Sequence, residues 1–466
     1  MTPMGEPAPL LPRRARWIGF GLLLVLAAAG LFSACSSPPR IERPNIVLIT
    51  LDTTRRDRLG VYGCPQPTSP QLDRMAAESV VYTRAVAPSN WTLPAHASLF
   101  TGKFTTSHGA RFDSRGPLTL AGQLSGSGEF WSQFRARGLA ADEPTLAALL
   151  QRAGYATGGV AAGPWLKRAF GLQAGFAFYD DENIGTENGR PAPDVNAAAL
   201  KFLEQRAARP FFLFVNYFDP HFPYQPPEAW IERFRPHEMT IAPVASERSI
   251  GQQRVLYDAE IAYMDHHLGQ LLDRLRRDGL YDQSWIIVTS DHGEMLGEHG
   301  RMGHGHRLYQ QEIHIPLVMK YPHGEQRARR TDVPIQLTEL APMILERLAL
   351  ERPPEMQGGV PPEIGHPLIA EVYPLEALSQ DGDTRAIFDG SFKFVWNAKG
   401  QHALYDLGDD PGELKNLLDE HPERARSMSE RLESFLARLP KPPPPGEQQI
   451  IDEQTQRALR ELGYLD

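Results

Sequence analysis

RPNIVLITLD, at residues 43–52, is an apolar run of strand length that ends on an acidic side chain, Asp52. Further β-like runs follow, separated by patterns in which apolar residues recur at three- and four-residue steps, as on a helix. Strands that alternate with helices are typical of a doubly wound α/β sheet. We expect strands at 45–51, 155–161, 210–217, 285–289 and 315–320, and helices at 70–79, 143–153, 195–206 and 256–277. A large catalytic domain is therefore expected over residues 41–380.

A second, smaller unit is expected after the large domain. The ranges 386–396 and 403–406 have the pattern of antiparallel strands, and 422–439 that of a helix, so we expect a small C-terminal α+β subdomain over 381–440. Residues 441–466 are expected to form a proline-rich spacer and a terminal helix at 451–462. The range 115–137, rich in glycine and serine towards its middle, indicates a surface insertion.

The composition excludes several classes of protein. Of the 466 residues, 41% are apolar and 23% charged, which is ordinary for a globular chain and argues against disorder. The formal net charge of −9 argues against a nucleic-acid partner, because such partners require a basic face. With only two cysteines, the chain cannot build a disulfide framework or a thiolate zinc cluster.

The N-terminus has the pattern of an export signal. Arginines at 13, 14 and 16 precede an apolar run over 17–34, so residues 1–40 are expected to be signal peptide and linker. LFSAC at 31–35 resembles a bacterial lipobox, which predicts lipidation of Cys35 and a membrane-anchored protein on the periplasmic or cell-surface side. An uncleaved transmembrane anchor is the alternative, because about 18 apolar residues can also span a bilayer. Both alternatives place the catalytic domain outside the cytoplasm.

Side chains that can bind a metal follow three of the expected strands. Asp52 follows the first, Asp219 and His221 the third, and Asp291 and His292 the fourth. Open α/β sheets bind ligands at the carboxyl ends of their strands, so these side chains are expected to meet. For Asp52 taken alone, a helix cap is the competing interpretation.

A threonine stands at the start of a short helix pattern. In NWTLPAHASLFTG, residues 90–102, Pro94 is expected at the first helical position and Gly102 ends the pattern, with Thr92 just ahead. A helix N-terminus attracts anions, and a hydroxyl placed there beside a dication can act as a nucleophile. The alternative is that Thr92 only caps the helix.

Five blocks in order resemble the sulfatase family. RPNIVLITLD with LGVYG (59–63) resembles the opening of sulfatases, and TLPAHASLFTG (92–102) their nucleophile signature. FDPHFPY (218–224), TSDHGEMLGEHG (289–300) and LYDL to DPGE (404–413) continue the likeness, which covers about residues 43–439. The resemblance implies an alkaline-phosphatase-like α/β/α sandwich with a small C-terminal sheet subdomain.

The nucleophile block departs from the classical pattern. Classical sulfatases oxidise a Cys or Ser to formylglycine, whereas this chain has Thr92, with His96 at the position of the signature's arginine, so no formylglycine is expected. Asp52, Thr92, Asp291 and His292 make the ligand set of threonine-nucleophile relatives, which are phosphodiesterases, phosphatases and phosphoethanolamine or phosphoglycerol transferases.

The expected ion follows from the same comparison. Thr53 replaces a second acid that the family usually has, and fewer carboxylates with an imidazole favour zinc or manganese over calcium. The family's central lysine and histidine have no match in GPWLK at 163–167.

The resemblance also assigns roles to histidines. His221 lies in the block that contacts the ester group, which implies leaving-group protonation or anion binding, and His304 lies near the position of a sulfate-binding lysine. Alternatively, His221, His304 and Asp219 complete a second metal site. His96 and His108, like Asp219, are candidates for supporting contacts around the centre, with a structural role as the alternative for each histidine.

The expected function is hydrolysis of a phosphate or sulfate ester on a small molecule, glycan or lipid, with Thr92 as nucleophile and a divalent metal. A transferase that passes the group to a glycan or lipid is the second hypothesis. A non-catalytic relative that binds anions or glycans is the third.

Overall fold

The computed structural model describes residues 43–113, 116, 118–119, 135–184, 189–362, 364–374, 381–442 and 449–450. The predicted signal and lipobox region with Cys35, most of the insertion at 115–137 and the terminal helix at 451–462 lie outside the described residues. Within the described part, no helix has both the length and the apolar character needed to cross a bilayer.

A nine-stranded sheet forms the centre of the large domain. Its strands are β1 Asn45–Leu51, β2 Val80–Val86, β6 Ala156–Val160, β7 Phe178–Asp180, β8 Phe211–Tyr217, β9 Ser284–Thr289, β12 His314–Lys320, β13 Arg329–Thr331 and β14 Ile335–Gln336. They pair in the order β13-β2-β12-β9-β1-β8-β6-β7, and β14 also pairs with β2. The five predicted strands are confirmed, with ends shifted by at most one residue.

The middle of this sheet is parallel and covered on both sides. Strands β9, β1, β8, β6 and β7 run parallel, and every residue of β1, β8 and β9 is buried. Continuous apolar runs are expected for such strands because helices cover both faces. Strand β12 runs antiparallel to both β9 and β2, and β2 itself was not among the predicted strands.

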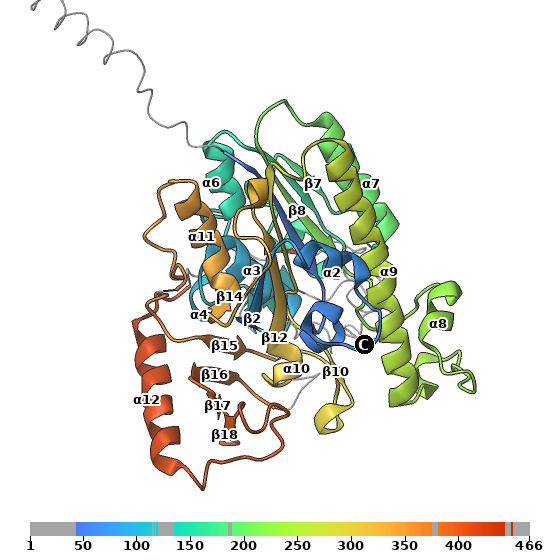
Figure 1. The fold of residues 1–466 in the computed structure, drawn as a ribbon. Coiled ribbons are helices and arrows are strands. Elements are labelled where there is room, and N and C mark those ends of the chain that lie inside the picture. Colours follow the sequence, from blue (N-terminus) through green and yellow to red (C-terminus); the bar gives the residue numbers. More distant parts are fainter. Residues whose placement is uncertain are drawn as a thin grey trace, which may run out of the picture. The chain divides into compact units, whose positions relative to one another are not determined.

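Helices form the two outer layers (Figure 1). On one side lie α2 Pro70–Ala76, α7 Ala192–Gln205 and α9 Ile250–Arg277, and on the other lie α3 Thr92–Thr101, α6 Leu146–Arg152 and α11 Leu340–Arg347. The predicted α/β/α arrangement is therefore confirmed. Helix α9 begins six residues before the predicted start, where Ser249 and Gln252 form a capping box.

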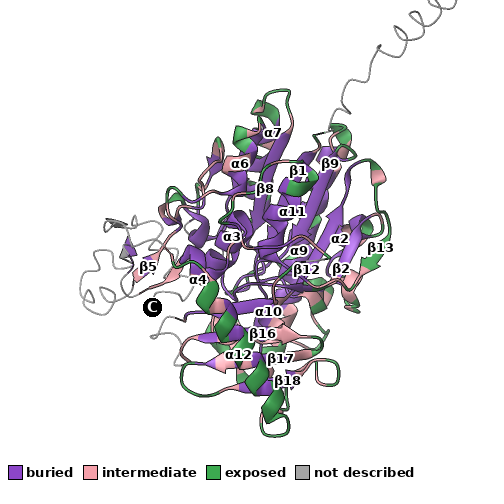
Figure 2. Ribbon diagram, turned by 90° about the vertical axis from the view of Figure 1, so that its left-hand side faces the viewer, coloured by how far each residue is buried: buried purple, intermediate pink, exposed green. Residues whose placement is uncertain are grey.

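The C-terminal subdomain is a four-stranded antiparallel sheet covered by one helix. The strands are β15 Ile369–Val372, β16 Thr384–Asp389, β17 Phe392–Asn397 and β18 Ala403–Asp406, and the helix is α12 Pro422–Arg438. Interpreting 386–396 as one strand was wrong, because the chain turns back at Gly390, whose φ of 63° suits glycine. Figure 2 shows exposed residues along the outer side of α12 and buried strands in the large sheet.

Short elements complete the fold. Strands β3 Arg111–Phe112, β4 Leu118–Thr119, β5 Arg135–Arg137 and β19 Gln449–Ile450 form a small sheet, and β10 Met295–Leu296 pairs with β11 Met302–Gly303 as a hairpin. Among the described residues, the remaining helices with α geometry are α4 Thr105–His108, α8 Glu228–Phe234 and α10 Gln310–Ile313.

Candidate active site

The carboxyl ends of two neighbouring strands bring three metal-binding side chains together. Asp52 follows β1, and Asp291 and His292 follow β9, which pairs directly with β1. One ligand atom from each of the three lies within 4.8 Å of the others, and all three side chains are fully buried. The structure thus assembles three of the four ligands expected from the sequence.

The carboxylates of this cluster suit a cation. Asp52 Oδ1 and Asp291 Oδ2 are buried and accept no hydrogen bond from any described residue. Burial raises the pKa of Asp52 well above its usual value, with the charge of Asp291 as the next cause, and burial raises the pKa of Asp291 to about 6. Buried carboxylate oxygens that lack a donor are costly unless they are protonated or neutralised by a cation, so the residues present fit a divalent metal.

His292 presents a ring nitrogen to the carboxylates. Its Nδ1 lies 2.9 Å from the carbonyl oxygen of Gly293, so Nδ1 carries the proton and donates it, which leaves the lone pair on Nε2. That Nε2 lies 3.4 Å from Asp291 Oδ2. Burial lowers the pKa of His292 well below its usual value, so the ring is neutral, as a metal ligand must be.

Thr92 is the first residue of α3 and points at this cluster. The N-cap of α3 is Trp91, so the helix starts two residues before the predicted Pro94. The Thr92 side chain makes no capping bond, and its Oγ1 lies 3.4 Å from His292 Nε2. The capping interpretation is therefore wrong, and all four expected ligands are neighbours. The N–H groups of the first helical turn have no partner inside the helix, which favours an anion here.

His96 supports the nucleophile from one turn further along α3. Its Nδ1 lies 2.9 Å from the carbonyl oxygen of Thr92 and 3.6 Å from Asp291 Oδ2, and its Nε2 lies 3.0 Å from Thr50 Oγ1. The ring is fully buried, and burial lowers its pKa. The geometry makes His96 a positioning residue that ties α3 to β1 and to the carboxylate cluster.

Three histidines and a glutamate line one side of the cluster. The ring centroids of His292 and His304 are 4.4 Å apart, and those of His304 and His221 are 5.1 Å apart. His304 Nδ1 lies 2.9 Å from Glu294 Oε1, and His221 Nδ1 lies 2.5 Å from the carbonyl oxygen of Phe222. Burial lowers the pKa of His221 and of His304 to about 3.

Sequence reasoning missed Glu294, although it lies inside the quoted block at 289–300. The β10–β11 hairpin pairs Met295 with Gly303, which places Glu294 beside His304. Glu294 is fully buried, and the available signal was a carboxylate only two residues after His292 in the sequence.

Asn216 and Thr53 also hold the cluster in place. Asn216 Nδ2 donates to Thr50 Oγ1 at 3.2 Å and to Asp52 Oδ2 at 3.4 Å, and its Oδ1 accepts from the N–H groups of Ala162 and Gly163. The backbone N–H of Thr53 donates to Asp291 Oδ1 at 3.3 Å. Asn216 was missed, although it is the polar residue in the otherwise aromatic and aliphatic strand β8.

Two expected supporting residues lie at the starts or ends of helices. Asp219 Oδ1 accepts a hydrogen bond from the N–H of Ala192, the first residue of α7, at 3.0 Å. His108 accepts from the N–H of Ala110 at its Nδ1 and lies 3.0 Å from Ser98 Oγ at its Nε2. Both ring nitrogens of His108 are therefore occupied by structural bonds.

No second group of side chains at metal-ligating distances is found in the part of the chain that the structure describes. Among the described residues, the cluster of Asp52, Asp291 and His292 is the only group of three or more His, Cys, Asp or Glu side chains at metal-ligating distances. Asp219, His221 and His304 do not meet that distance, so the alternative of a second metal at these residues is not supported.

Comparison with known proteins identifies the family. Residues 44–350 match the family described as Sulfatase, and residues 297–441 match the region described as N-sulphoglucosamine sulphohydrolase, C-terminal. The chain belongs to the sulfatase family and is an ester hydrolase with an alkaline-phosphatase-like fold. The fold that the resemblance implied is confirmed.

Several relatives cover most of the chain. The uncharacterized sulfatase YidJ of Escherichia coli is 25% identical over 429 residues, which are 82% of this chain and 84% of that protein. An ulvan-active sulfatase of Formosa agariphila is 25% identical over 402 residues, 81% of this chain and 77% of that protein.

Solved structures share the fold. The protein BT4656 in complex with its substrate D-glucosamine-2-N,6-O-disulfate has a TM-score of 0.69 at 20% identity, over 85% of this chain and 98% of that one. A phosphonate monoester hydrolase of Agrobacterium radiobacter has a TM-score of 0.66 at 21% identity, over 85% of this chain and 96% of that one.

Proposed function

We propose that the chain hydrolyses sulfate or phosphate esters with Thr92 as the nucleophile and one divalent metal held by Asp52, Thr92, Asp291 and His292. The observation that carries the proposal is the position of Thr92 Oγ1, 3.4 Å from His292 Nε2, beside two buried carboxylates with oxygens that accept no hydrogen bond from described residues. Zinc or manganese suits this donor set better than calcium, because one ligand is an imidazole and only two are carboxylates.

The residues around Thr92 have separate roles in the proposed reaction. The first turn of α3 attracts the ester's oxygens, while His96 holds the backbone of Thr92. When bound, the cation supplies positive charge that stabilises the Thr92 oxygen and the charge that develops on the ester. Thr92 Oγ1 forms a bond to sulfur or phosphorus as the ester's alcohol leaves, and water then displaces Thr92 from that intermediate.

The histidines handle protons on the other side of the cluster. The bond from His304 to Glu294 places the ring proton on Nδ1, so the lone pair lies on Nε2 and can accept a proton from the attacking water. His221, stacked on Phe218 at 4.4 Å between centroids and next to His304, carries its ring proton on Nδ1, so its Nε2 can take up the Thr92 hydroxyl proton and pass it to the leaving oxygen.

Sulfated glycans are the substrate class that the relatives favour. One neighbour is described with a disulfated glucosamine as its substrate and another relative as ulvan-active, so a glycan ester is the first candidate. The phosphonate monoester hydrolase among the structural neighbours supports testing phosphorus esters in parallel. The proposed location is outside the cytoplasm, anchored at the membrane through Cys35, which rests on the N-terminal sequence pattern.

The same site also admits transfer to an alcohol on a glycan or lipid in place of water. That second candidate uses the same Thr92 intermediate and differs only in the acceptor. A non-catalytic anion-binding or glycan-binding protein is disfavoured, because the nucleophile and its three partners are assembled together.

Replacement of Thr92 tests the proposal. We expect Thr92→Ala to lower kcat by about 10³-fold or more, since no other group can form the covalent intermediate, and Thr92→Ser to retain a fraction of the activity. Thr101→Ala is a matched control at the other end of α3, where Thr101 Oγ1 donates to the carbonyl of Ala97. Full activity of Thr92→Ala would overturn the nucleophile assignment.

The substrate panel should contain nitrophenyl sulfate, phosphate monoester and phosphate diester. We expect phosphate esters to be cleaved at least as well as sulfate esters, because a threonine alkoxide releases its ester by in-line displacement, whereas sulfatase aldehyde chemistry needs a hydrate that threonine lacks. Activity and intact mass should be unchanged by co-expression with a formylglycine-generating enzyme. Strong sulfate hydrolysis that depends on such an enzyme would contradict this expectation.

A further inference from the structure

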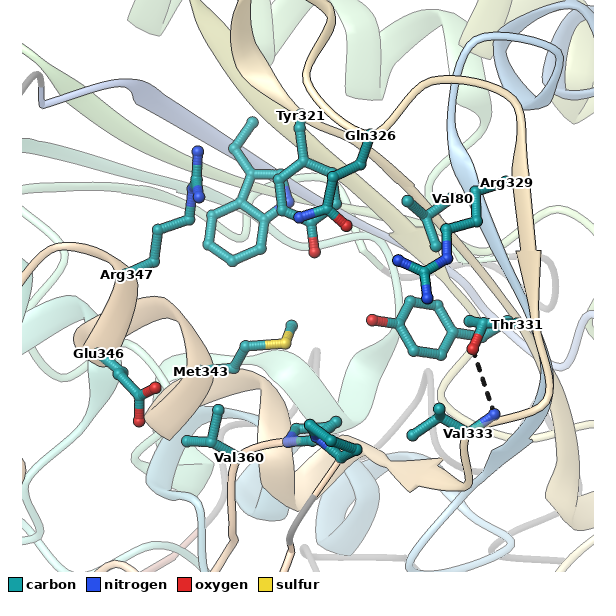
Figure 3. Close-up of a pocket in the computed structure, with 14 residues that line it drawn as sticks. Val80, Tyr321, Gln326, Arg329, Thr331, Val333, Met343, Glu346, Arg347 and Val360 are labelled. Atoms are coloured by element: carbon teal, nitrogen blue, oxygen red, sulfur yellow. Dashed lines mark hydrogen bonds between the residues drawn. The ribbon is translucent and has the colours of Figure 1, made fainter.

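A second cavity lies at the edge of the sheet opposite to the active site. Its volume is about 440 Å³, and it is lined by residues at the starts of β2 and β9, with Tyr321 just after β12 (Figure 3). Trp285, the second residue of β9, lines it, whereas Asp291 follows the other end of that strand. At about 3.3 Å per residue, these two residues are separated by about 20 Å. The cavity is therefore distinct from the metal cluster.

The floor of the cavity is an aromatic pair. Trp285 and Tyr321 stack with ring centroids 5.2 Å apart and an angle of 23°. Trp285 is fully buried, and its indole Nε1 has no hydrogen-bond partner among the described residues. Because this nitrogen is itself buried, the floor offers a bound molecule apolar contact and no hydrogen bond.

Two arginines lie on opposite sides of the opening (Figure 3). The guanidinium of Arg347 lies 5.2 Å from the ring centroid of Tyr321 and pairs with Glu325. Arg329 is exposed, and its guanidinium pairs with no acid of the described chain. A planar guanidinium binds carboxylate, sulfate or phosphate oxygens in pairs, so Arg329 suits an anionic group.

The remaining wall is apolar. Met343, Val360 and Val333 face the same space (Figure 3). Ligand cavities in proteins usually measure about 300 to 1,000 Å³ and combine apolar walls with a few polar groups, which is the combination found here.

We propose that this cavity binds a small organic anion whose sulfonate, sulfate, phosphate or carboxylate group pairs with Arg329. The apolar or aromatic part of this anion lies against Met343 and Tyr321. This site does not depend on the ester hydrolysis proposed for Thr92.

Calorimetric titration with 2-naphthalenesulfonate tests the proposal, because this probe is an aromatic anion without an ester bond. Saturable one-to-one binding is expected for the wild type. Arg329→Ala should weaken it about tenfold, the effect of one charge-assisted hydrogen bond, and Met343→Ala should weaken it several-fold by removing apolar contact with the probe. Arg330→Ala is the matched control, because Arg330 is the next residue of β13 and donates to the carbonyl of Val61 instead.

A further variant distinguishes binding of the probe in the cavity from binding of the probe in the active site. Asp291→Asn should leave the affinity for the probe unchanged if the cavity at Trp285 is the site. The proposal is overturned if the wild type binds no probe, or if Asp291→Asn abolishes binding while Arg329→Ala leaves it intact. Arg329 is exposed, so its replacement carries the test even if Met343→Ala fails to fold.

Discussion

Asp52 and Asp291 are the two carboxyl groups of the candidate metal site, where burial disfavours their charged forms. Both are fully buried, and burial is the main cause of the rise in the pKa of each carboxyl. Asn216 and the N–H of Thr53 stabilise one oxygen of each charged form, but the other oxygen of each lacks a donor. Protons and cations therefore compete for the same two side chains.

This competition predicts how metal stabilisation depends on pH. The pKa of Asp291 is about 6 in the folded protein and about 3.9 in an unfolded chain, so the proton bound by Asp291 stabilises the metal-free fold fully below about pH 4. That contribution is lost as the pH rises through 6, where the carboxylate becomes available to a cation. Zinc or manganese should thus stabilise the protein by on the order of 1 kcal/mol less at pH 5 than at pH 7.

Melting temperatures with and without metal, at pH 5 and pH 7, measure this difference. Asp291→Asn serves as the control, because it removes the titrating group and a ligand, and should show little metal-induced stabilisation at either pH. A shift in melting temperature that is as large at pH 5 as at pH 7 would contradict the assignment.

His304 is expected to act on protons without holding the metal. Its ring contacts both His292 and His221, and its Nδ1 is held by Glu294. We expect His304→Ala to lower kcat by about 10²-fold or more, the usual contribution of general acid or base catalysis, with the bound metal unchanged. Kinetics together with metal analysis check this, and His299→Ala, stacked on Tyr309, is the control. Loss of the metal with loss of activity would instead make His304 a ligand.

Among the secondary-structure elements, the long strands could be located from the sequence, whereas the pairing of the short hairpin could not. The apolar runs of β1, β8 and β9 are long because both faces are covered, so their ends, and the side chains after them, could be located from sequence. Glu294 and His304 meet only because the β10–β11 hairpin pairs in one register, which residue types alone do not specify.

Other differences have equally local causes. Strand β2 reads VVYTRAV, and its polar Thr83 and Arg84 interrupt the apolar run that marked the other strands. The range 386–396 is apolar enough to resemble one strand, yet Gly390 turns it into a hairpin. Thr92 was placed ahead of its helix because Pro94 was expected at the first position, whereas proline is tolerated throughout the first turn.

A buried ion pair fastens the C-terminal subdomain next to the active-site segments. Lys393 of β17 and Glu413 are fully buried, with Nζ and Oε1 2.5 Å apart, and Glu413 Oε2 accepts from the N–H of Gln310 at 2.6 Å. Glu413→Ala should destabilise the protein by about 3 to 5 kcal/mol, because it leaves a buried ammonium without its partner.

Urea unfolding measures this loss of stability, and an exposed ion pair provides the comparison. Lys415 and Glu420 form an ion pair whose side chains are 64% and 52% exposed, so Glu420→Ala should cost less than about 1 kcal/mol. The double variant Lys393→Met with Glu413→Leu should recover much of the stability, because it removes both buried charges. If Glu413→Ala and Glu420→Ala lower the free energy of unfolding equally, the buried pair contributes no more to stability than the exposed one.

For the whole molecule, the large sheet separates two chemical environments. The carboxyl ends of β1 and β9 hold the carboxylates and His292, and the amino end of β9 holds the aromatic floor of the second cavity. Because both sites share β9, a rigid strand fixes their separation. The proposed metal site combines residues that follow β1 and β9 with Thr92 at the start of α3, so it can form only when these segments have folded together.

The attachment of this domain to the membrane is a prediction about Cys35. A lipobox cysteine becomes the lipid-carrying N-terminus of the mature protein, so Cys35→Ala should block that processing and release the enzyme from the membrane fraction. Activity per molecule should be unchanged, because the described domain begins at β1, beyond residue 40. Cys64→Ala is the control, since Cys64 is the free cysteine of the folded domain. Fractionation and intact mass report the result, and a Cys35→Ala protein that stays in the membrane with an unchanged N-terminus would support an uncleaved anchor over residues 17–34.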